Sequence, residues 1–202
     1  MRVPQANSQH EHKLAVGFRY LYVIRSSDVV TIILPKMGQG FLVREFIRQD
    51  AARLAEIELD TDVKRFLALP KKDKAEWIES FDPDSYGGWA VDVDGVLAGR
   101  VSLLRGKRRG DGELAIVVSR PFWGVQLGRK VAAMFIHAAF EELNARALVA
   151  EVHPENKASI ALLRAFKFRR RGVVVTSPEH WQYGHFVYRL SRGSYNKSAQ
   201  GR

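Results

Sequence analysis

One continuous segment, Glu113–Phe168, constrains the fold more than any other part of the chain, because β-prone and helix-prone pieces alternate along it. Leu114–Val118 is an unbroken apolar run that predicts a strand. A glycine-bearing turn follows, and then apolar residues recur at helical spacing over about 127–143. A second apolar strand, Ala147–Val152, precedes a shorter helix over 157–166. This order predicts an α/β fold in which a helix N-terminus opens beside a strand end, an arrangement that binds phosphate groups through backbone N–H groups.

Composition places this segment in a globular protein. With 202 residues, the chain is long enough for one domain with a sizeable core. Charged residues make up 27% of it, an ordinary value that argues against disorder. The formal net charge of +10 is unusual and predicts attraction to polyanions, such as a phosphorylated cofactor, an acidic peptide or nucleic acid. For any single Lys or Arg, a solvated basic face is the alternative interpretation.

The absence of cysteine excludes disulfide frameworks, thiolate zinc sites and a cysteine nucleophile. The short His-bearing stretch Gln9–His12 lacks the further ligands that zinc needs, so we expect no metal. The apolar run near the N-terminus is interrupted by Arg25–Asp28, which argues against both a membrane span and a signal peptide. We therefore expect a soluble cytoplasmic protein without a membrane partner.

Residues 1–36 differ in character from the rest, and the pattern becomes regular only after Met37. We expect 1–36 to be an N-terminal extension that is not part of the native domain, with Met37 as the true start. The domain itself is expected to cover 37–190. The polar, glycine-containing tail 191–202 is expected to fray.

The remaining elements complete an α/β fold whose sheet is mixed and mostly antiparallel, with six to seven strands and about four flanking helices. Asp50 is expected to be the N-cap of a helix that runs through Glu58. Asp94-Gly95 supplies a tight turn between two strands over 89–104. The other expected elements are a strand over 41–47, short helical stretches over 63–67 and 74–81, and closing strands over 168–176 and 185–190.

Two motifs carry a resemblance to a known family: Trp123-Gly-Val-Gln-Leu-Gly128 and Asn156-x-x-Ser-Ile-x-Leu-Leu163. Together they resemble the acyl-CoA-binding half of the GNAT N-acetyltransferase superfamily. They are most similar to the branch that acetylates the alanine or serine N-termini of ribosomal proteins. The resemblance spans about 41–190 and implies a GNAT fold, with acetyl-CoA bound in a splay between the fourth and fifth strands of the fold. It further implies direct transfer of the acetyl group to a primary amine, either a protein N-terminus or a small-molecule amine, in a ternary complex.

The resemblance also implies a set of cofactor-binding residues, with backbone N–H groups holding the pyrophosphate and one near Val117–Ser119 polarising the thioester carbonyl. For Arg129 and Lys130 a solvated first helical turn is the alternative, for Asn156 a helix N-cap, and for Ser159 a small residue in a helical turn. The full implied set is Val117, Val118, Trp123, Gly124, Val125, Gln126, Leu127, Gly128, Arg129, Lys130, Asn156 and Ser159.

Three positions depart from the family pattern. Gln126 stands at the first motif glycine, where a side chain could crowd the phosphates or change the backbone angle. Lys167 replaces the glycine that usually closes the following helix. Leu163 stands where some relatives carry a tyrosine general acid, so Ser159 or a water would have to protonate the departing thiolate. These departures and the positive charge support a second hypothesis, a catalytically weak GNAT-fold module that binds RNA or another polyanion.

The proposed chemistry needs a base that deprotonates the amine. Glu113 is the first candidate, because its apolar strand neighbours would raise its pKa. The alternative is a strand-edge carboxylate paired with a cation of 107–109. His153, just after a strand, is the second candidate base. The expected partners are acetyl-CoA, the amine acceptor and, from the basic charge, a ribosome or nucleic acid nearby; the protein would be a monomer or a homodimer.

Overall fold

The computed structural model describes residues 23–26, 29–32, 36–38, 40–67, 87–176, 180 and 182–200. The helical stretch expected over 74–81 lies outside these residues. In chain order the elements are β1 Val23–Ser26, β2 Val29–Ile32, β3 Lys36–Gly38, β4 Phe41–Arg44, α1 Asp50–Leu59, α2 Thr61–Lys64, β5 Gly88–Val93, β6 Val96–Arg105, β7 Asp111–Val118, α4 Leu127–His137, β8 Ala147–Val152, α5 Lys157–Ala165, β9 Arg169–Val173, β10 Phe186–Ser191 and α6 Arg192–Gln200.

A mixed sheet in the order β3-β4-β5-β6-β7-β8-β10-β9 forms the centre of the molecule. Only the β7–β8 pair is parallel, and every other neighbouring pair in this sheet is antiparallel. The predicted α/β class and mostly antiparallel sheet are confirmed. Seven of the strands follow Phe41, as predicted, and the short strand β3 adds an eighth at one edge. Strands β1 and β2 pair separately as a two-stranded sheet.

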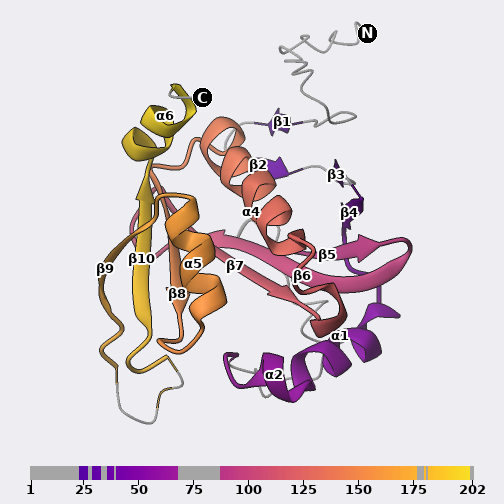
Figure 1. The fold of residues 1–202 in the computed structure, drawn as a ribbon. Helices are drawn as coiled ribbons and strands as arrows, with labels where there is room; N and C mark the ends of the chain where they lie inside the picture. Colours follow the sequence, from indigo (N-terminus) through magenta and orange to yellow (C-terminus); the bar gives the residue numbers. More distant parts are fainter. Residues whose placement is uncertain are drawn as a thin grey trace, which may run out of the picture.

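The parallel pair β7–β8 is joined only at one end. Its register runs from Asp111 opposite Ala147 to Glu113 opposite Val149, and no pairing between the two strands continues beyond that point. In Figure 1, β7 accordingly runs obliquely to β8 and β10. The edge of β7 from Leu114 onward is therefore open toward β8.

The hairpin between β5 and β6 forms as expected. Asp94 and Gly95 both adopt positive φ, 50° and 79°, as a two-residue turn of this type requires. Farther along β6, Gly99 permits an unusually close approach to β7, because a Cβ at this position would lie 2.1 Å from the carbonyl oxygen of Val117. Gly99 therefore allows β7 to lie close to β6 at Val117, next to the open edge of β7.

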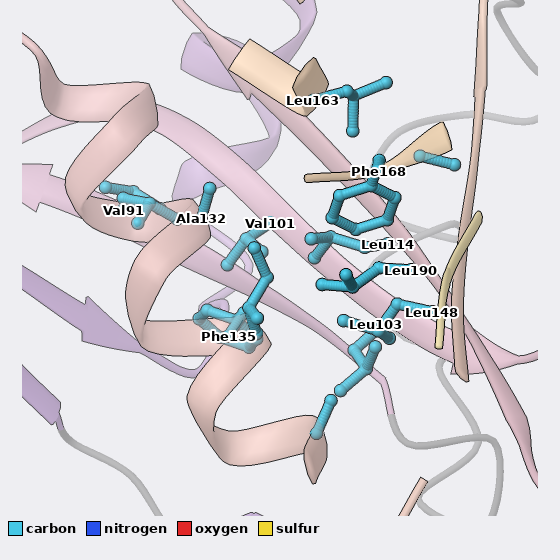
Figure 2. Close-up of a cluster of buried hydrophobic side chains, with 14 of the residues drawn as sticks. Val91, Val101, Leu103, Leu114, Ala132, Phe135, Leu148, Leu163, Phe168 and Leu190 are labelled. Carbon is cyan, nitrogen blue, oxygen red and sulfur yellow. The ribbon is translucent and has the colours of Figure 1, made fainter. Parts of the chain in front are cut away.

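Helices α4 and α5 cover one face of the sheet (Figure 1). Phe135 of α4 is fully buried and points toward Val101 and Leu103 of β6, as Figure 2 shows. Leu163 of α5 and Phe168, which follows it, join the same cluster. Full burial of one such side chain contributes about 1.5–3 kcal/mol, so this cluster fixes both helices against the sheet.

The opposite face of the sheet is covered by α1 and α2. Leu54 and Ile57 of α1 pack against Leu97 and Val117, and Val63 of α2 joins this second cluster. Val117 of β7 therefore contacts the helical layer opposite to α4. As a result, both surfaces of the open strand are fixed by packing.

The start of α1 differs from the expectation that Asp50 is its N-cap. Gln49 holds the cap position, and Asp50 is the first helical residue. Its carboxylate accepts hydrogen bonds from the Ile47 N–H group at 2.9 Å and from Arg44 Nη1 at 2.7 Å, and Arg44 also binds Asp92. Burial would raise the pKa of Asp50, but these hydrogen bonds outweigh it and lower the pKa. The residue thus ties the loop before α1 to the sheet.

The tail expected to fray instead forms helix α6 and packs on the domain. Arg192 donates hydrogen bonds to the carbonyl oxygens of Phe140 and Ala145. Tyr195 stacks on the ring of Phe140 at a centroid distance of 4.6 Å. The π-helical stretch Ala138–Glu142, which continues α4, is therefore anchored by the C-terminal segment. None of the helices that the structure describes is long and apolar enough to cross a bilayer.

Candidate active site

A cavity of about 720 Å³ opens where β7 and β8 separate. It is lined by β7, the first turn of α4, the end of β8 and the first turns of α5. The structure brings together in this one cavity all but three of the predicted site residues: Glu113, Val117, Val118, Trp123, Gly124, Gln126, Leu127, Gly128, His153, Asn156 and Ser159.

The remaining three predicted residues lie elsewhere. Val125 and Lys130 line a smaller neighbouring cavity, and Arg129 is exposed and lines neither. For Arg129 the solvated first turn of α4 is therefore the better interpretation.

The open edge of β7 presents backbone groups to the cavity. Val118 directs its carbonyl oxygen away from β6, where it accepts a 2.7 Å hydrogen bond from Trp123 Nε1. In extended backbone the N–H group points to the same edge as the C=O group of its residue, so the Val118 N–H also faces the opening. The next amide, of Ser119, turns back and donates to Ala98 of β6 at 2.8 Å. By the same alternation Val117 faces β6 with its backbone and contributes only its side chain to the cavity wall.

Helix α4 begins directly against this opening. Its N-cap, Gln126, makes no side-chain capping hydrogen bond, so the N–H groups of the first turn remain available to a ligand. Gly128 is not required by packing, because a Cβ there would meet only Val118 Cγ2, at an ordinary 3.6 Å. The absence of a side chain at Gly128 leaves room for a ligand to approach the first turn of α4. This helix N-terminus is suited to an anionic group such as a pyrophosphate.

The two positions that lack the family glycine keep the glycine conformation. Gln126 and Lys167 have φ of 62° and 64°, in the left-handed region. After α5, the Phe168 N–H group donates a 3.0 Å hydrogen bond to the Leu163 carbonyl oxygen, and the Lys167 N–H group donates a 2.9 Å hydrogen bond to that of Arg164. These are the two hydrogen bonds of the Schellman motif, which usually has glycine at the position of Lys167. Both residues therefore adopt backbone angles that glycine favours, although a non-glycine residue in the left-handed region costs about 1–2 kcal/mol.

At the start of α5, the side chain of Asn156 caps the helix. Its Oδ1 accepts a 3.0 Å hydrogen bond from the Ser159 N–H group, which confirms the capping interpretation. The Nδ2 group of Asn156 and the hydroxyl of Ser159 remain able to bond a ligand in the same cavity. Leu163, one turn further on, is part of the core and offers no acid.

Two carboxylates lie in the half of the cavity away from α4. Glu113 makes no ion pair with any residue that the structure describes; Lys107 instead contacts Glu151 of β8, with Nζ 3.2 Å from Oε1. The alternative interpretation of Glu113 as a strand-edge partner of 107–109 is therefore not supported. Burial, and next the charge of Glu151, raise the pKa of Glu113, while Lys107 acts weakly in the opposite direction. A raised pKa suits a carboxylate to proton transfer near neutral pH.

His153 lies at the same end, between Phe66 of the α2 segment and His185. The ring centroids are 5.6 Å from Phe66 and 5.3 Å from His185. His153 Nδ1 accepts a 3.2 Å hydrogen bond from the Glu155 N–H group, so the neutral ring carries its proton on Nε2. This contact favours a hydrogen-bond donor over the predicted base. Burial, and next the neighbouring His153, lower the pKa of His185, so that ring is held neutral.

Glu151, His185 and Phe66 were missed as site residues, although all three line the cavity. Glu151 had a detectable signal, since it is the one charged residue of the apolar strand Ala147–Val152. No local pattern indicates His185 or Phe66, because the closing strand and α2 reach the site only through the tertiary fold.

Comparison with known proteins agrees with this geometry. Residues 41–169, more than half of the chain, match the family model described as an acetyltransferase (GNAT) domain. An acetyltransferase of the GNAT family from Bacillus anthracis superposes with a TM-score of 0.66 at 17% identity, covering 78% of this chain and 98% of that one.

Two further solved structures share the fold. Mycobacterium smegmatis RimJ, solved in complex with CoA-disulfide, gives a TM-score of 0.64 at 17% identity, covering 80% of this chain and 90% of its own. The ribosomal-protein-S5-alanine acetyltransferase from Vibrio fischeri gives 0.64 at 15% identity, covering 81% and 99%. The fold is common to all three, and the match over residues 41–169 establishes that the chain belongs to the GNAT acetyltransferase family.

Proposed function

We propose that this acyltransferase moves an acetyl group from acetyl-CoA to a primary amine in a ternary complex. The observation that carries the proposal is a single cavity with two chemically different ends. One end has the open helix N-terminus at Gly128, and the other has the carboxylates of Glu113 and Glu151. An anionic cofactor and a cationic amine would therefore meet along the open edge of β7.

The cofactor would lie along this edge. The first-turn N–H groups of α4 would bind the pyrophosphate, and Asn156 would bond the pantetheine arm. The Val118 N–H group is the donor best placed to polarise the thioester carbonyl, because it points into the opening. Acetyl-CoA supplies the activated acyl group, and the chain supplies orientation and proton transfer.

The acceptor amine would lose its proton to the carboxylate pair. Glu113, with its raised pKa, is the first candidate base, and Glu151 is the second. The neutral amine would then attack the thioester carbonyl carbon, and the nitrogen would release its second proton to solvent as the C–S bond breaks. The thiolate would take a proton from a water or from Ser159, whose hydroxyl would regain its proton from solvent. No cysteine is present to form an acyl-enzyme, which is consistent with direct transfer.

For the acceptor we propose either a protein N-terminus or a small-molecule amine. The name of the Vibrio fischeri neighbour, a ribosomal-protein acetyltransferase, supports the first class by analogy of fold alone. The carboxylate pair supports any cationic amine, and the aromatic wall of Phe66 and His153 would border its approach.

One observation favours a second candidate function, binding of RNA or another polyanion. Strand β9 lies at the edge of the sheet and exposes three consecutive arginines, Arg169, Arg170 and Arg171. Two other arguments for this function have weakened, because Gln126 and Lys167 keep the backbone that glycine would adopt. Salt-dependent RNA binding without CoA-dependent turnover would favour this candidate.

The acetyltransferase proposal is tested by measuring thiol release from acetyl-CoA with a panel of amines. Glu113→Gln and Glu151→Gln should each reduce turnover, since each removes a carboxylate from the acceptor end. Glu141→Gln is the matched control, because Glu141 is exposed and lies outside the cavity. If the three variants release thiol at the same rate, neither Glu113 nor Glu151 takes part in the mechanism. If the wild-type chain releases no thiol in an amine-dependent way, the proposal is contradicted.

A further inference from the structure

Arg65 adds a cation to the wall of the cavity. It directly follows helix α2, and both Arg65 and the next residue, Phe66, line the cavity. The Arg65 guanidinium lies over the Phe66 ring, with Cζ 4.5 Å from the ring centroid. Arg65 forms no ion pair with any residue that the structure describes. Asp62, three residues earlier on the same helix, instead lies 3.4 Å from Nη1 of Arg120.

The other two described cations that line the cavity are Arg100 and Lys157. Arg100 of β6 contacts the buried carboxylate of Glu58, with Nε 2.7 Å from Oε1, so its charge is balanced within the fold. Lys157 is the first residue of α5, next to Asn156 in the part of the cavity proposed for the cofactor. Arg65 is therefore the cation best suited to the acceptor.

The strand register shows which part of the wall faces the reacting acyl group. Pairing between β7 and β8 ends with Glu113 opposite Val149. Four residues further along each strand are Val117 and His153, so these two stand at a similar level on opposite sides of the opening. His153 therefore lies across from the region of the Val118 N–H group, which is proposed to hold the thioester carbonyl.

Arg65 lies close to this level through its neighbour. The Phe66 ring centroid is 5.6 Å from that of His153 and 4.5 Å from Cζ of Arg65. Together, the two distances place the guanidinium carbon no more than about 10 Å from the His153 ring. A group attached to the reacting amine can thus contact Arg65 without any movement of the chain.

We propose that Arg65 is a specificity-determining residue that binds a carboxylate of the acceptor. The preferred acceptor is then a primary amine that carries an acidic group a short distance from the amine. This inference rests on the proposed function and deepens it, because it names the chemical class of the acceptor.

The charges of the cavity match both ends of such a molecule. The carboxylates of Glu113 and Glu151 come from the sheet and suit the amine, whereas Arg65 comes from the helical layer and suits the acid. A guanidinium donates two parallel hydrogen bonds to a carboxylate. The contact with the face of Phe66 restricts the guanidinium before an acceptor binds, which reduces the entropy lost on binding.

The acid can come from two sources. An extended polypeptide advances about 3.3–3.6 Å per residue, so an acidic side chain at the second or third position of a protein N-terminus would reach Arg65. A free amino acid carries an amine and a carboxylate within one residue. The chemistry recognised by Arg65 is the same in both, and the acceptors in the test distinguish them.

The test measures kcat/KM by thiol release from acetyl-CoA with the purified full chain. Three tripeptides begin with serine, end with alanine and differ only in the second residue, which is glutamate, glutamine or lysine. We expect the glutamate peptide to exceed the glutamine peptide by roughly 10-fold, as one charge-assisted hydrogen bond allows, and the lysine peptide to be the poorest. Glycine compared with glycinamide measures the preference for the carboxylate of a free amino acid.

Variants of Arg65 assign any preference to this side chain. Arg65→Gln should abolish it by raising KM for the glutamate peptide, with the affinity for acetyl-CoA unchanged. Arg65→Glu should reverse it in favour of the lysine peptide, which a purely structural role would not produce. Lys64→Gln is the matched control and should keep the wild-type preference, because Lys64 is exposed and does not line the cavity.

A preference for the glutamate peptide that Arg65→Gln removes supports a protein N-terminus, and the same result confined to glycine supports a free amino acid. The inference is wrong if neither acidic acceptor is preferred or if the preference survives Arg65→Gln. Neutral amines separate this failure from failure of the proposed function. If they are acetylated as well as acidic ones, only the class of acceptor is wrong. If no amine supports thiol release, the proposed function fails and this inference fails with it.

Discussion

Replacing Gln126 and Lys167 by glycine should stabilise the protein. Both residues hold left-handed backbone, with φ of 62° and 64°, and both side chains are exposed. Removing the strain of an L residue there gains about 1–2 kcal/mol, and the greater freedom of glycine in the unfolded chain returns about 0.4–1 kcal/mol. The net expected gain is roughly 0.5–1 kcal/mol for each substitution.

Gln126 precedes α4 and Lys167 follows α5, so the two changes in the free energy of unfolding should add. Gln126→Gly with Lys167→Gly should therefore raise the free energy of unfolding by about 1–2 kcal/mol, or the melting temperature by about 2–8 °C for a domain of this size. Urea denaturation measures the first quantity and calorimetry the second.

Ala161→Gly is the matched control. Ala161 is exposed on α5 in right-handed helical backbone, where glycine is expected to lose about 1 kcal/mol. If Gln126→Gly and Lys167→Gly destabilise the protein as much as Ala161→Gly does, the two residues are not held in left-handed backbone. The turn before α4 would then not keep its glycine-like backbone with Gln126 in place.

Three further predictions concern the cavity. Gly128→Glu should abolish acetyl-CoA binding while Gly128→Ala, whose Cβ meets only an ordinary 3.6 Å contact, should fold and bind; calorimetric titration compares them, and equal affinities would refute the site. Glu113→Gln should raise the free energy of unfolding at pH 7, because the raised pKa means that the folded state disfavours the ionised form. The gain should shrink as the pH falls through the raised pKa of the folded-state carboxyl and should be absent below its pKa in the unfolded chain. Denaturation measured across pH checks this, and a gain that grows toward low pH would contradict it. Gly99→Ala should destabilise the protein by about 1–3 kcal/mol or more, because its Cβ would lie 2.1 Å from the Val117 carbonyl oxygen; a neutral result in urea denaturation would mean that β7 does not approach β6 so closely.

Local patterns were sufficient to predict most elements of the fold. The strand over 147–152 and the helix that begins at Lys157 were located because apolar periodicity and an Asn156 cap are local properties. The parallel β7–β8 pair and its early separation have no local signal, and they came only through the family resemblance. The tail was misjudged because Arg192 and Tyr195 are polar in sequence, and their partners lie some fifty residues earlier, around Phe140.

The candidate site divides in the same way. Its cofactor half could be predicted because the turn and both helix starts are contiguous motifs. Sequence reasoning found Glu113 but missed Glu151, since the two carboxylates approach each other across strands whose pairing ends at Glu113 opposite Val149. The backbone angle of Gln126 could not be predicted from the sequence, because the surrounding turn imposes this angle whatever the side chain.

Calorimetric titration of the full chain with acetyl-CoA at moderate salt would show whether this cavity binds the cofactor. We expect one-to-one binding with a dissociation constant in the micromolar range, about −8 kcal/mol in free energy, through the turn that begins α4. Absence of binding heat, together with absence of affinity by an independent method, would contradict the assignment of this cavity to acetyl-CoA.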